Sequence, residues 1–490
     1  MTTQWTPRES AVVAGVARAD ITPPVGIRAH NWGAARVGQA TGVHRPLTAS
    51  ALAVADDAVG WRYLLTVDLG WWQSFAGYQR VYRPVLAALC PTALPPTAPA
   101  AGSDPAVSPA ASAAGSASAG GGEPDAVLLH LVHTHAGPTL AEEDSGLPGS
   151  ELVGAYRERL VQALIEVATV AREAAQQATV TWAYGSCRLA ANRDLPLAER
   201  DVLGFNPAGS ADDTVLVGRI TAAGGAPVGV LVNYACHPTT LAHQNTLVSP
   251  DYVGAVREVV EQHAGAPCLF LQGASGDLGP REQYAAGTEV ADRHGRALGH
   301  AVASVLETMG TPGSALHFGG VVESGAPLGI WHEAALAPPS GSSFARLDVP
   351  IACRPDPSQS TVDRWADIDP AAAAERRARA GRLAEGYAAG GAARHPVFVW
   401  RLGDAVIVAH PGEAYSQLQT ELRRRHPERA VAVLNLTNGP GFMYLPPREA
   451  YRRDRYQVWQ TLAAEGTLEA VTDAADAAIA ALPPARPVAS

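Results

Sequence analysis

Three histidines stand close together in the stretch LLHLVHTHAGPTL, residues 128–140. His133 and His135 are two residues apart, and on an extended strand side chains two apart point to the same face of the sheet. This spacing favours two imidazoles that converge on one site, such as a metal ion. The alternative is a pair of core or surface histidines with ordinary hydrogen bonds. His130 has the opposite parity and should face away, so we interpret it as an ordinary core histidine.

Two further candidates for the same site follow other apolar runs. His237 comes after the run in VNYACHPTTL, just before a proline, and Glu413 comes after the run in VIVAHPGEAY. The Glu413 carboxylate could instead interact with the N-terminus of the helix that it opens. Together with the H-x-H pair, these residues form a His, His and carboxylate set that suits zinc with one position left open for water. Zinc lowers the pKa of such a water to about 7, which generates a nucleophile at neutral pH.

Asp277 lies in LFLQGASGDLGP, a glycine-rich transition from strand to loop. Glycines allow the backbone to approach a ligand closely, but this stretch lacks the G-x-x-x-x-G-K pattern of a phosphate loop. The chain also has no G-x-G-x-x-G in a strand–turn–helix setting, no G-x-S-x-G and no H-E-x-x-H. The common nucleotide-binding, serine-hydrolase and zincin explanations therefore lose their main support.

The elements that must position these residues alternate along the chain. Strands are expected at 62–70, 126–135, 214–220, 227–237, 267–273 and 430–439, and a hairpin at 396–413 with Gly403-Asp404 as its turn. Helices are expected at 151–177, 252–264, 286–308, 370–388, 414–425 and 464–481. This alternation predicts an α/β (α+β) fold of mixed β-sheets flanked by helices. Several of the strands end in polar motifs, and rigid strand ends are where ligand and catalytic groups gather.

Composition restricts the class of protein and of partner. Of the 490 residues, 47% are hydrophobic, which indicates a folded globular protein. The formal net charge of −10 disfavours binding to nucleic acid or to anionic membrane surfaces, so we expect a small-molecule substrate. The sequence shows no secretory signal and no apolar run long enough to cross a membrane, and we expect a cytoplasmic protein. It does not indicate an oligomeric state.

One segment departs from this composition. Residues 91–124 consist mainly of Pro, Ala, Ser and Gly, and such a stretch cannot repay the entropy of ordering it. We interpret it as a flexible surface insertion in a single catalytic domain that spans 1–490, with an inter-domain linker as the alternative. Outside this segment, Trp32, Trp71 and Trp72 are expected either to line an apolar pocket or to pack in the core.

The order and wording of the motifs resemble the neutral/alkaline non-lysosomal ceramidases and their bacterial relatives. The matching stretches are GVARADITPP (15–24), HTHAGP (133–138), ANRD (191–194), NYACHPTTL (233–241), VSPDYVG (248–254), LFLQGASGDLGP (269–280), HPGE (410–413) and NGPGFMYLPPREAY (438–451). They extend over nearly the whole chain. The resemblance implies a ceramidase-like catalytic domain that hydrolyses a linear amide, a C–N bond, with the help of zinc.

The resemblance also implies roles for individual residues. In that family two histidines, a glutamate and a tyrosine hold the catalytic zinc, and they correspond to His133, His237, Glu413 and Tyr444. The second histidine of the H-T-H motif, His135, would polarise the scissile carbonyl together with Arg193, and the hydroxyl of Tyr456 would sit near the oxyanion. The protein would then be a metal-dependent amidohydrolase in which zinc-activated water attacks the carbonyl. Either Asp277 or His135 would share the proton transfer.

Two departures from the family concern the substrate. Ceramidases carry a serine at the G-D-x-S-P position near the zinc, where this chain has Gly279. They also continue into a C-terminal immunoglobulin-like domain, which we expect to be missing here because the sequence ends soon after its last predicted helix. The first change leaves the metal chemistry intact and puts ceramide in doubt as the substrate. Three alternatives stay open: a zinc-dependent ester or lactone hydrolase, a specialised biosynthetic amidohydrolase acting on a small non-lipid substrate, and a non-catalytic metal-binding protein.

Overall fold

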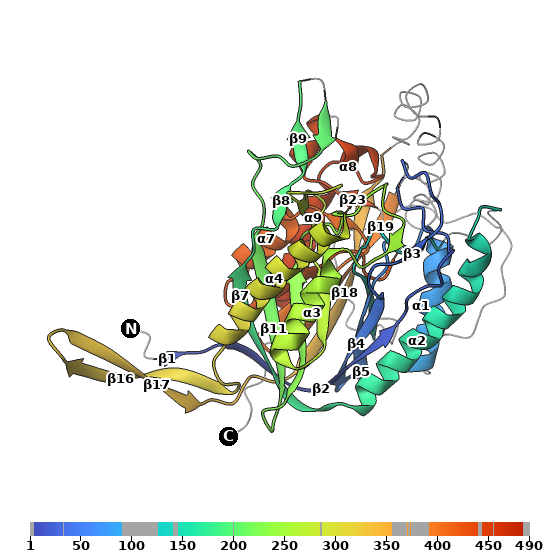
Figure 1. The fold of residues 1–490 in the computed structure, drawn as a ribbon. Coiled ribbons are helices and arrows are strands. Elements are labelled where there is room, and N and C mark those ends of the chain that lie inside the picture. The colour runs from blue at the N-terminus through green and yellow to red at the C-terminus, as the bar shows by residue number, and fades with distance from the viewer. Residues whose placement is uncertain are drawn as a thin grey trace, which may run out of the picture.

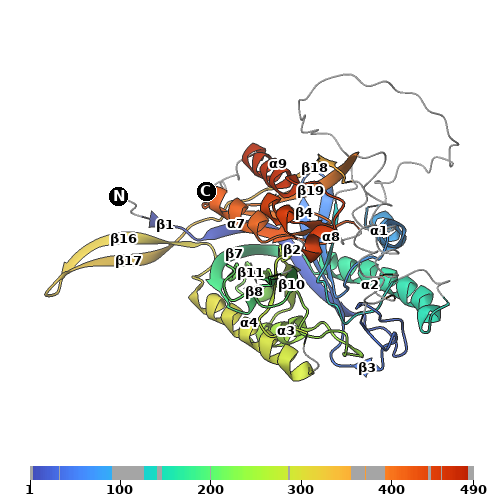
Figure 2. The same ribbon diagram turned by 90° about the horizontal axis from the view of Figure 1, so that it is seen from above.

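The structure, a computed structural model, describes residues 4–32, 34–90, 126–140, 146–198, 200–284, 287–354, 370, 373, 392–439, 443–453 and 455–483. Two β-sheets form its central layers, and helices cover them on the outside (Figures 1 and 2). The predicted insertion at 91–124 lies outside the described residues. So does the predicted helix at 370–388, apart from residues 370 and 373.

The larger layer is an eight-stranded mixed sheet. Its strands, in spatial order, are β14 (Cys268–Gln272), β12 (Pro227–Tyr234), β11 (Thr214–Ala222), β7 (Gln176–Ser186), β2 (Arg8–Asp20), β4 (Thr48–Asp56), β5 (Gly60–Val67) and β6 (Val127–Leu131). The central pairs are antiparallel, and the outermost pairs, β12–β14 and β5–β6, are parallel. Parallel neighbours end at the same edge of a sheet, so the loops after these strands lie near one another.

The smaller layer is a four-stranded sheet that packs against the larger one. Its strands are β18 (Ser342–Ala352), β19 (Ala392–Leu402), β20 (Ala405–Ala409) and β22 (Ala430–Leu434). One apolar cluster joins the facing surfaces, with Trp182 and Leu231 from the large sheet and Trp400 and Ile407 from the small one. Every residue of β20 and β22 is buried, as expected for strands that are covered on both faces.

Helices cover the outer face of each sheet. The large sheet is covered by α1 (Phe75–Leu89) and α2 (Val153–Glu173) over one half and by α3 (Tyr252–Ala264) and α4 (Thr288–Thr308) over the other. The small sheet is covered by α7 (Gln417–Arg425) and α9 (Thr467–Ala481). This helix–sheet–sheet–helix arrangement confirms the predicted fold class. Within the described ranges, no helix has the length and apolar character to cross a membrane.

The remaining elements are short or lie at the periphery. Four two-stranded pairs are β3 (Gly42–Val43) with β13 (Leu247–Val248), β8 (Ala190–Asn192) with β15 (Leu278–Pro280), β9 (Asp194–Pro196) with β10 (Asp201–Leu203), and β21 (Glu413–Ala414) with β23 (Tyr444–Leu445). A third sheet contains β1 (Gln4–Trp5), β16 (Ser314–Glu323) and β17 (Pro327–Ala335). The short helices are η2 (Ser150–Leu152), η3 (Arg448–Arg452) and α8 (Tyr456–Trp459).

Several predicted elements end or begin elsewhere, and three of the changes affect candidate ligands. The strand expected at 227–237 ends at Tyr234, before His237. The strand expected at 126–135 ends at Leu131, because His133 adopts a left-handed backbone conformation with φ of 75°. The helix expected at 414–425 begins at Gln417, since the preceding residues pair with β23 instead. The predicted hairpin at 396–413 is confirmed: β19 and β20 are antiparallel, with Gly403 in the turn at φ of 52°.

His130 is an ordinary core histidine, as the sequence indicated. Its ring is fully buried, and its Nδ1 lies 2.9 Å from the carbonyl oxygen of Asn435. Its Nε2 accepts a hydrogen bond of 2.9 Å from the backbone N–H of Gln272. A nitrogen that accepts from an N–H carries no proton, so the ring is neutral with its hydrogen on Nδ1. It ties β6 to β14 and to the segment after β22.

Protonation of His130 should contribute to acid denaturation. Burial lowers the pKa of this ring to about 3, whereas an unfolded histidine titrates near 6.5. The neutral His130 ring therefore contributes fully to the free energy of unfolding above about pH 6.5. This contribution is lost as the pH falls toward about 3, because the unfolded chain binds a proton that the folded chain does not. Between about pH 6 and pH 4, the free energy of unfolding of the wild type should fall by about 1.4 kcal/mol more per pH unit than that of His130→Gln. Urea unfolding of both proteins in chelator tests this; parallel slopes would contradict it.

Candidate metal centre

Four strand ends bring the candidate ligands together. His133 follows β6, His237 follows β12, Glu413 follows β20 as the first residue of β21, and Tyr444 follows β22 as the first residue of β23. β21 and β23 are parallel neighbours in which Glu413 stands opposite Tyr444. All four side chains are at least nine-tenths buried. The polar strand ends noted in the sequence therefore meet at one place.

The distances between the candidate ligand atoms are short. His133 Nε2 lies 3.1 Å from His237 Nε2 and 3.2 Å from Glu413 Oε2. His237 Nε2 lies 3.0 Å from the same carboxylate oxygen. Burial, reinforced by the nearby Glu413 carboxylate, raises the pKa of the Tyr444 hydroxyl well above its usual value. Because Glu413 contacts both histidines and lies outside α7, the alternative that its carboxylate interacts with the N-terminus of that helix is wrong.

Backbone carbonyls fix the tautomers of both histidines. The Nδ1 atom of His133 lies 2.8 Å from the oxygen of Gly70, and that of His237 lies 2.6 Å from the oxygen of Ser275. Carbonyls only accept, so both Nδ1 atoms carry hydrogen, and each ring turns its Nε2 toward the other ring and toward the carboxylate. Two ring nitrogens and a carboxylate oxygen at these distances repel one another unless a cation or a proton lies between them. Two imidazole nitrogens and a carboxylate, oriented by carbonyls behind them, fit a zinc ion.

The protonation states of the same groups suit a metal. Burial, reinforced by the nearby Arg193 cation, lowers the pKa of His237 to about 3, so the ring is neutral at pH 7. Burial alone would raise the pKa of Glu413, but the adjacent rings of His133 and His237 outweigh it and hold that pKa well below its usual range. Neutral imidazole and ionised carboxylate are the forms that bind metal ions.

His135 reaches the same centre by a route that the sequence did not indicate. Its Nε2 lies 3.4 Å from His133 Nε2. The strand has ended before His133, so the convergence comes from the turn that the left-handed His133 makes, and not from alternation along a strand. A non-glycine residue in that conformation is a typical form of backbone strain at functional sites. His133, His135 and His237 lie close enough together to hold an ion by themselves.

Aromatic rings enclose His135. Trp32 and Trp71 lie with their ring centroids 5.0 Å and 5.1 Å from it, and Tyr284 packs edge-on against Trp32 at 5.7 Å. Trp72, by contrast, is fully buried in the core between the large sheet and α1 and α2. Burial, with the neighbouring His133 and His237, keeps the pKa of His135 well below its usual value. Its Nδ1 has no hydrogen-bond partner among the described residues.

Arg193 and Tyr456 also border the centre. The Arg193 guanidinium donates two hydrogen bonds to the carbonyl of Gly276, at 3.2 Å and 2.9 Å. One of its nitrogens lies 3.2 Å from His237 Nε2 and 3.1 Å from the Tyr444 hydroxyl. Tyr456, the first residue of α8, places its ring 5.8 Å from that of Tyr444. A fixed cation and a phenol thus stand beside the ligand cluster.

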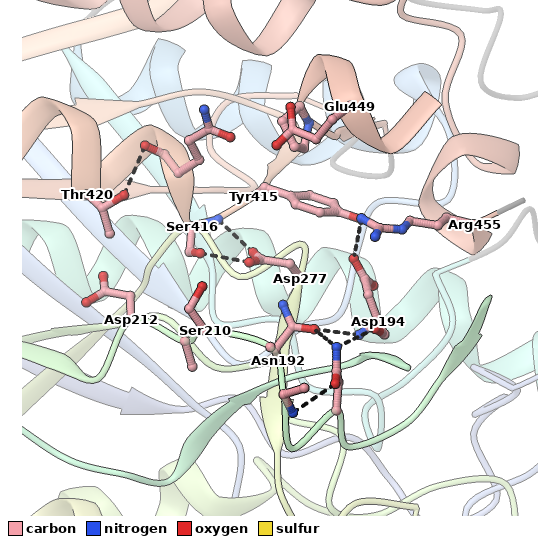
Figure 3. A pocket seen from close by; sticks show the side chains of 16 residues that line it. Asn192, Asp194, Ser210, Asp212, Asp277, Tyr415, Ser416, Thr420, Glu449 and Arg455 are labelled. Carbon is pink, nitrogen blue, oxygen red and sulfur yellow. Dashed lines mark hydrogen bonds and ion pairs between the residues drawn. The ribbon is translucent and has the colours of Figure 1, made fainter. Parts of the chain in front are cut away.

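The Asp277 carboxylate is engaged elsewhere. It accepts hydrogen bonds from the backbone N–H and the hydroxyl of Ser416, at 2.7 Å and 2.8 Å. It lines a polar cavity of about 690 Å³ together with Asp194 and Arg455 (Figure 3). Burial raises its pKa to about 6. Its backbone carbonyl accepts from the N–H of Arg193 at 2.9 Å, so the residue holds the Arg193 segment, and its contacts do not support the predicted share in proton transfer.

The residues that hold Glu413 in place were not predicted from the sequence. The Nε2 atom of His410 lies 2.8 Å from the Oδ1 atom of Asn435. Its Nδ1 atom accepts a hydrogen bond of 3.1 Å from the backbone N–H of Gly412. Asn435 also accepts from the N–H of Ala414 at 3.3 Å and donates to the Ala414 carbonyl at 3.2 Å. The residues on both sides of Glu413 are thus fixed. The signal in the sequence was the HPGE motif itself, whose histidine lies three residues before the glutamate.

Comparison with known proteins connects this arrangement to one fold. The chain matches no known family model and no curated protein. Its structure is similar to a ceramidase complexed with C2, with a TM-score of 0.63, 17% identity, and coverage of 98% of this chain and 77% of that one. It is also similar to neutral ceramidase from Pseudomonas aeruginosa, with a TM-score of 0.62, 16% identity, and coverage of 98% and 76%. The chain therefore has a neutral-ceramidase-like fold, as its motifs predicted.

Proposed function

Starting from this neutral-ceramidase-like fold, we propose that the protein is a zinc-dependent hydrolase that cleaves a linear amide bond. The observation that carries the proposal is the meeting of two histidine Nε2 atoms and a carboxylate oxygen within 3.2 Å, beside the Arg193 cation. A non-catalytic metal-binding protein would need the ligands only. The presence of Arg193, His135 and Tyr456 around them favours catalysis.

In the proposed centre, His133, His237, Glu413 and Tyr444 hold the zinc ion. Bound zinc would supply a Lewis acid and lower the pKa of a water molecule to about 7. Glu413 is engaged with both histidines, so it is not free to act as the general base. His135 is the better candidate, because its Nδ1 has no partner among the described residues and its ring lies next to His133. It would carry a proton from the attacking water to the leaving amine.

Three groups of the chain would stabilise the charge that develops on the carbonyl oxygen. Arg193 contributes a buried cation, Tyr456 a hydroxyl, and His135 a ring N–H, all bordering the ligand cluster. The Arg193 guanidinium is held in place by the Gly276 carbonyl, so it does not have to reorganise as the charge forms. Preorganised donors of this kind give a large share of the rate enhancement in acyl transfer.

The surroundings of Gly279 favour a small polar amide over long-chain ceramide. A Cβ atom at Gly279 would lie 2.7 Å from Gln283 Oε1, so the Gln283 side chain occupies the space into which a serine would project. Both polar atoms of the Gln283 carboxamide and the Nε1 of Trp32 are buried without a hydrogen-bond partner in the described part of the chain. Unpaired buried donors and acceptors favour a ligand that can pair with them and penalise an acyl chain that cannot.

Zinc content tests the ligand assignment. Purified wild type, loaded with zinc and dialysed, should contain one zinc per chain by plasma mass spectrometry. His133→Ala and His237→Ala should each lose it, because two of the converging donors then no longer exist. His263→Ala is the matched control, since His263 is partly exposed and pairs with Glu307. A wild type without stoichiometric zinc under these conditions would contradict the proposed centre.

Turnover tests the reaction class. Zinc-loaded wild type should hydrolyse N-acyl amides faster than the matching esters and lactones. Arg193→Ala and Tyr456→Phe should lower kcat by about 100-fold to 1,000-fold, because each removes a donor to the developing oxyanion. Zinc content is measured on the same samples, which separates lost chemistry from lost metal. Faster cleavage of the ester series by the wild type would favour the ester or lactone hydrolase instead.

Gln283 should set the substrate preference. Gln283→Ala should lower kcat/KM for short, polar N-acyl substrates by about 10-fold, since one hydrogen bond to the substrate is lost. Its kcat/KM for long-chain ceramide should stay the same or rise. Gly279→Ser, which would push the Gln283 carboxamide aside, should shift the preference in the same direction. A wild type that already prefers long-chain ceramide would contradict this substrate assignment.

A further inference from the structure

The hairpin of β16 and β17 extends away from the body of the molecule. Figures 1 and 2 show it from two directions as a long arm next to the N-terminal strand β1. The two strands pair from Ser314 opposite Ala335 to Glu323 opposite Pro327. β1 pairs only with the base of β16, through Gln4 and Trp5. We call β1 and residues 314–336 together the arm.

The arm carries a concentration of exposed apolar side chains. Eight of the seventeen large hydrophobic side chains that are exposed in the described residues lie on it: Trp5, Leu316, Phe318, Val321, Val322, Leu328, Trp331 and Leu336. Their exposed fractions range from 37% to 58%, and counted over both faces of the hairpin they present roughly 700 Å². A monomer rarely leaves an apolar surface of this size in contact with water. One side of a standard protein interface covers about 800 Å², so the arm is of the size that a stable association needs.

The arm also presents an unprotected strand edge. β17 is the outer strand of the sheet β1-β16-β17, and over its nine residues its outer side has no neighbouring strand in the described structure. Edge strands are usually blunted by charged residues, by proline, by a bulge or by a covering element. On β17 the proline, Pro327, lies at the end next to the tip, Glu333 is the one Asp, Glu, Lys or Arg residue, and the bulge between Phe318 and Gly320 lies on the inner strand. An isolated hairpin is also only marginally stable, so a partner would stabilise it.

The distribution of side chains selects the kind of partner. A membrane-inserting hairpin would place its apolar residues at the tip with basic residues beside them. Here the tip at Ser324–Ala326 is small, Glu323 stands next to it, and the exposed apolar residues run along the length of both strands. With a net charge of −10, the chain has no electrostatic attraction to anionic lipid. The surface therefore suits a protein partner that covers its whole length.

We propose that the arm is a dimerisation element that binds a second copy of this chain. The two β17 edges pair antiparallel around a two-fold axis, so that each supplies the missing neighbour of the other. Trp331 lies at the middle of β17, and the axis would bring the two copies of this residue side by side. A two-fold interface is self-complementary, so the same edge of each copy supplies the whole backbone contact and no different protein is needed.

Light scattering coupled to size exclusion, on the full chain, tests the proposal. The wild type should be a dimer at micromolar concentration, and Val321→Lys/Leu328→Lys should be a monomer with its dimer dissociation constant raised at least ~100-fold. The matched control is Val170→Lys on α2, where the valine is 47% exposed, and it should remain a dimer. Circular dichroism melts of all three proteins establish that each is folded.

Three results would overturn the dimer. One is a wild type that stays monomeric at about 100 μM, and another is a double lysine variant that dimerises as well as the wild type. The third comes from flotation with phosphatidylcholine vesicles. Binding of the wild type to these vesicles that the double lysine variant loses would assign the arm to a lipid surface. Wild type that does not float with the vesicles agrees with the proposal.

Discussion

Two imidazole nitrogens and a carboxylate oxygen meet in the interior within 3.2 Å of one another. The carbonyls of Gly70 and Ser275 hold the hydrogens of both rings on the far nitrogens. Buried charge without compensation costs several kcal/mol, so this arrangement is stable only with a cation or a shared proton at its centre. Much of the surrounding structure serves to hold these three atoms in place.

The fold meets this requirement through strand ends. The two sheets pack face to face, and β6, β12, β20 and β22 are each followed by a loop that carries one of the ligand candidates. Glu413 is the most constrained of them: its neighbours are bonded to His410 and Asn435, and its strand pairs with that of Tyr444. Arg193 stands beside the cluster because its guanidinium is bonded to the carbonyl of Gly276. The proposed hydrolase activity uses this rigidity to keep donors aimed at one point.

The sequence predicted those elements whose pattern of apolar residues is local. Continuous apolar runs predicted most of the strands next to the site, and the order of the motifs predicted the fold. The alanine-rich strands β2 and β4 were not predicted. Their small side chains allow close packing against α2, but alanine has a low strand propensity. The exposed hairpin of β16 and β17 was not predicted either, because its apolar residues do not alternate as in a strand with one buried face.

At the site, residue types were predictable and conformations were not. The left-handed turn at His133 is imposed by contacts distant in sequence, such as the bond from its N–H to the Leu69 carbonyl. Asp277 appears in a motif with the right chemistry, but Ser416, far away in the chain, determines where its carboxylate points. Gln283 lies four residues after Gly279, and the position of its carboxamide beside that glycine is a local contact that the motif did not indicate.

Anomalous diffraction at the zinc absorption edge, from crystals grown with zinc, tests the central claim most directly. The account predicts one strong peak about 2.0–2.2 Å from the Nε2 atoms of His133 and His237 and from a carboxylate oxygen of Glu413. No peak at that place, or a peak at other histidines such as His395 and His410, would contradict it.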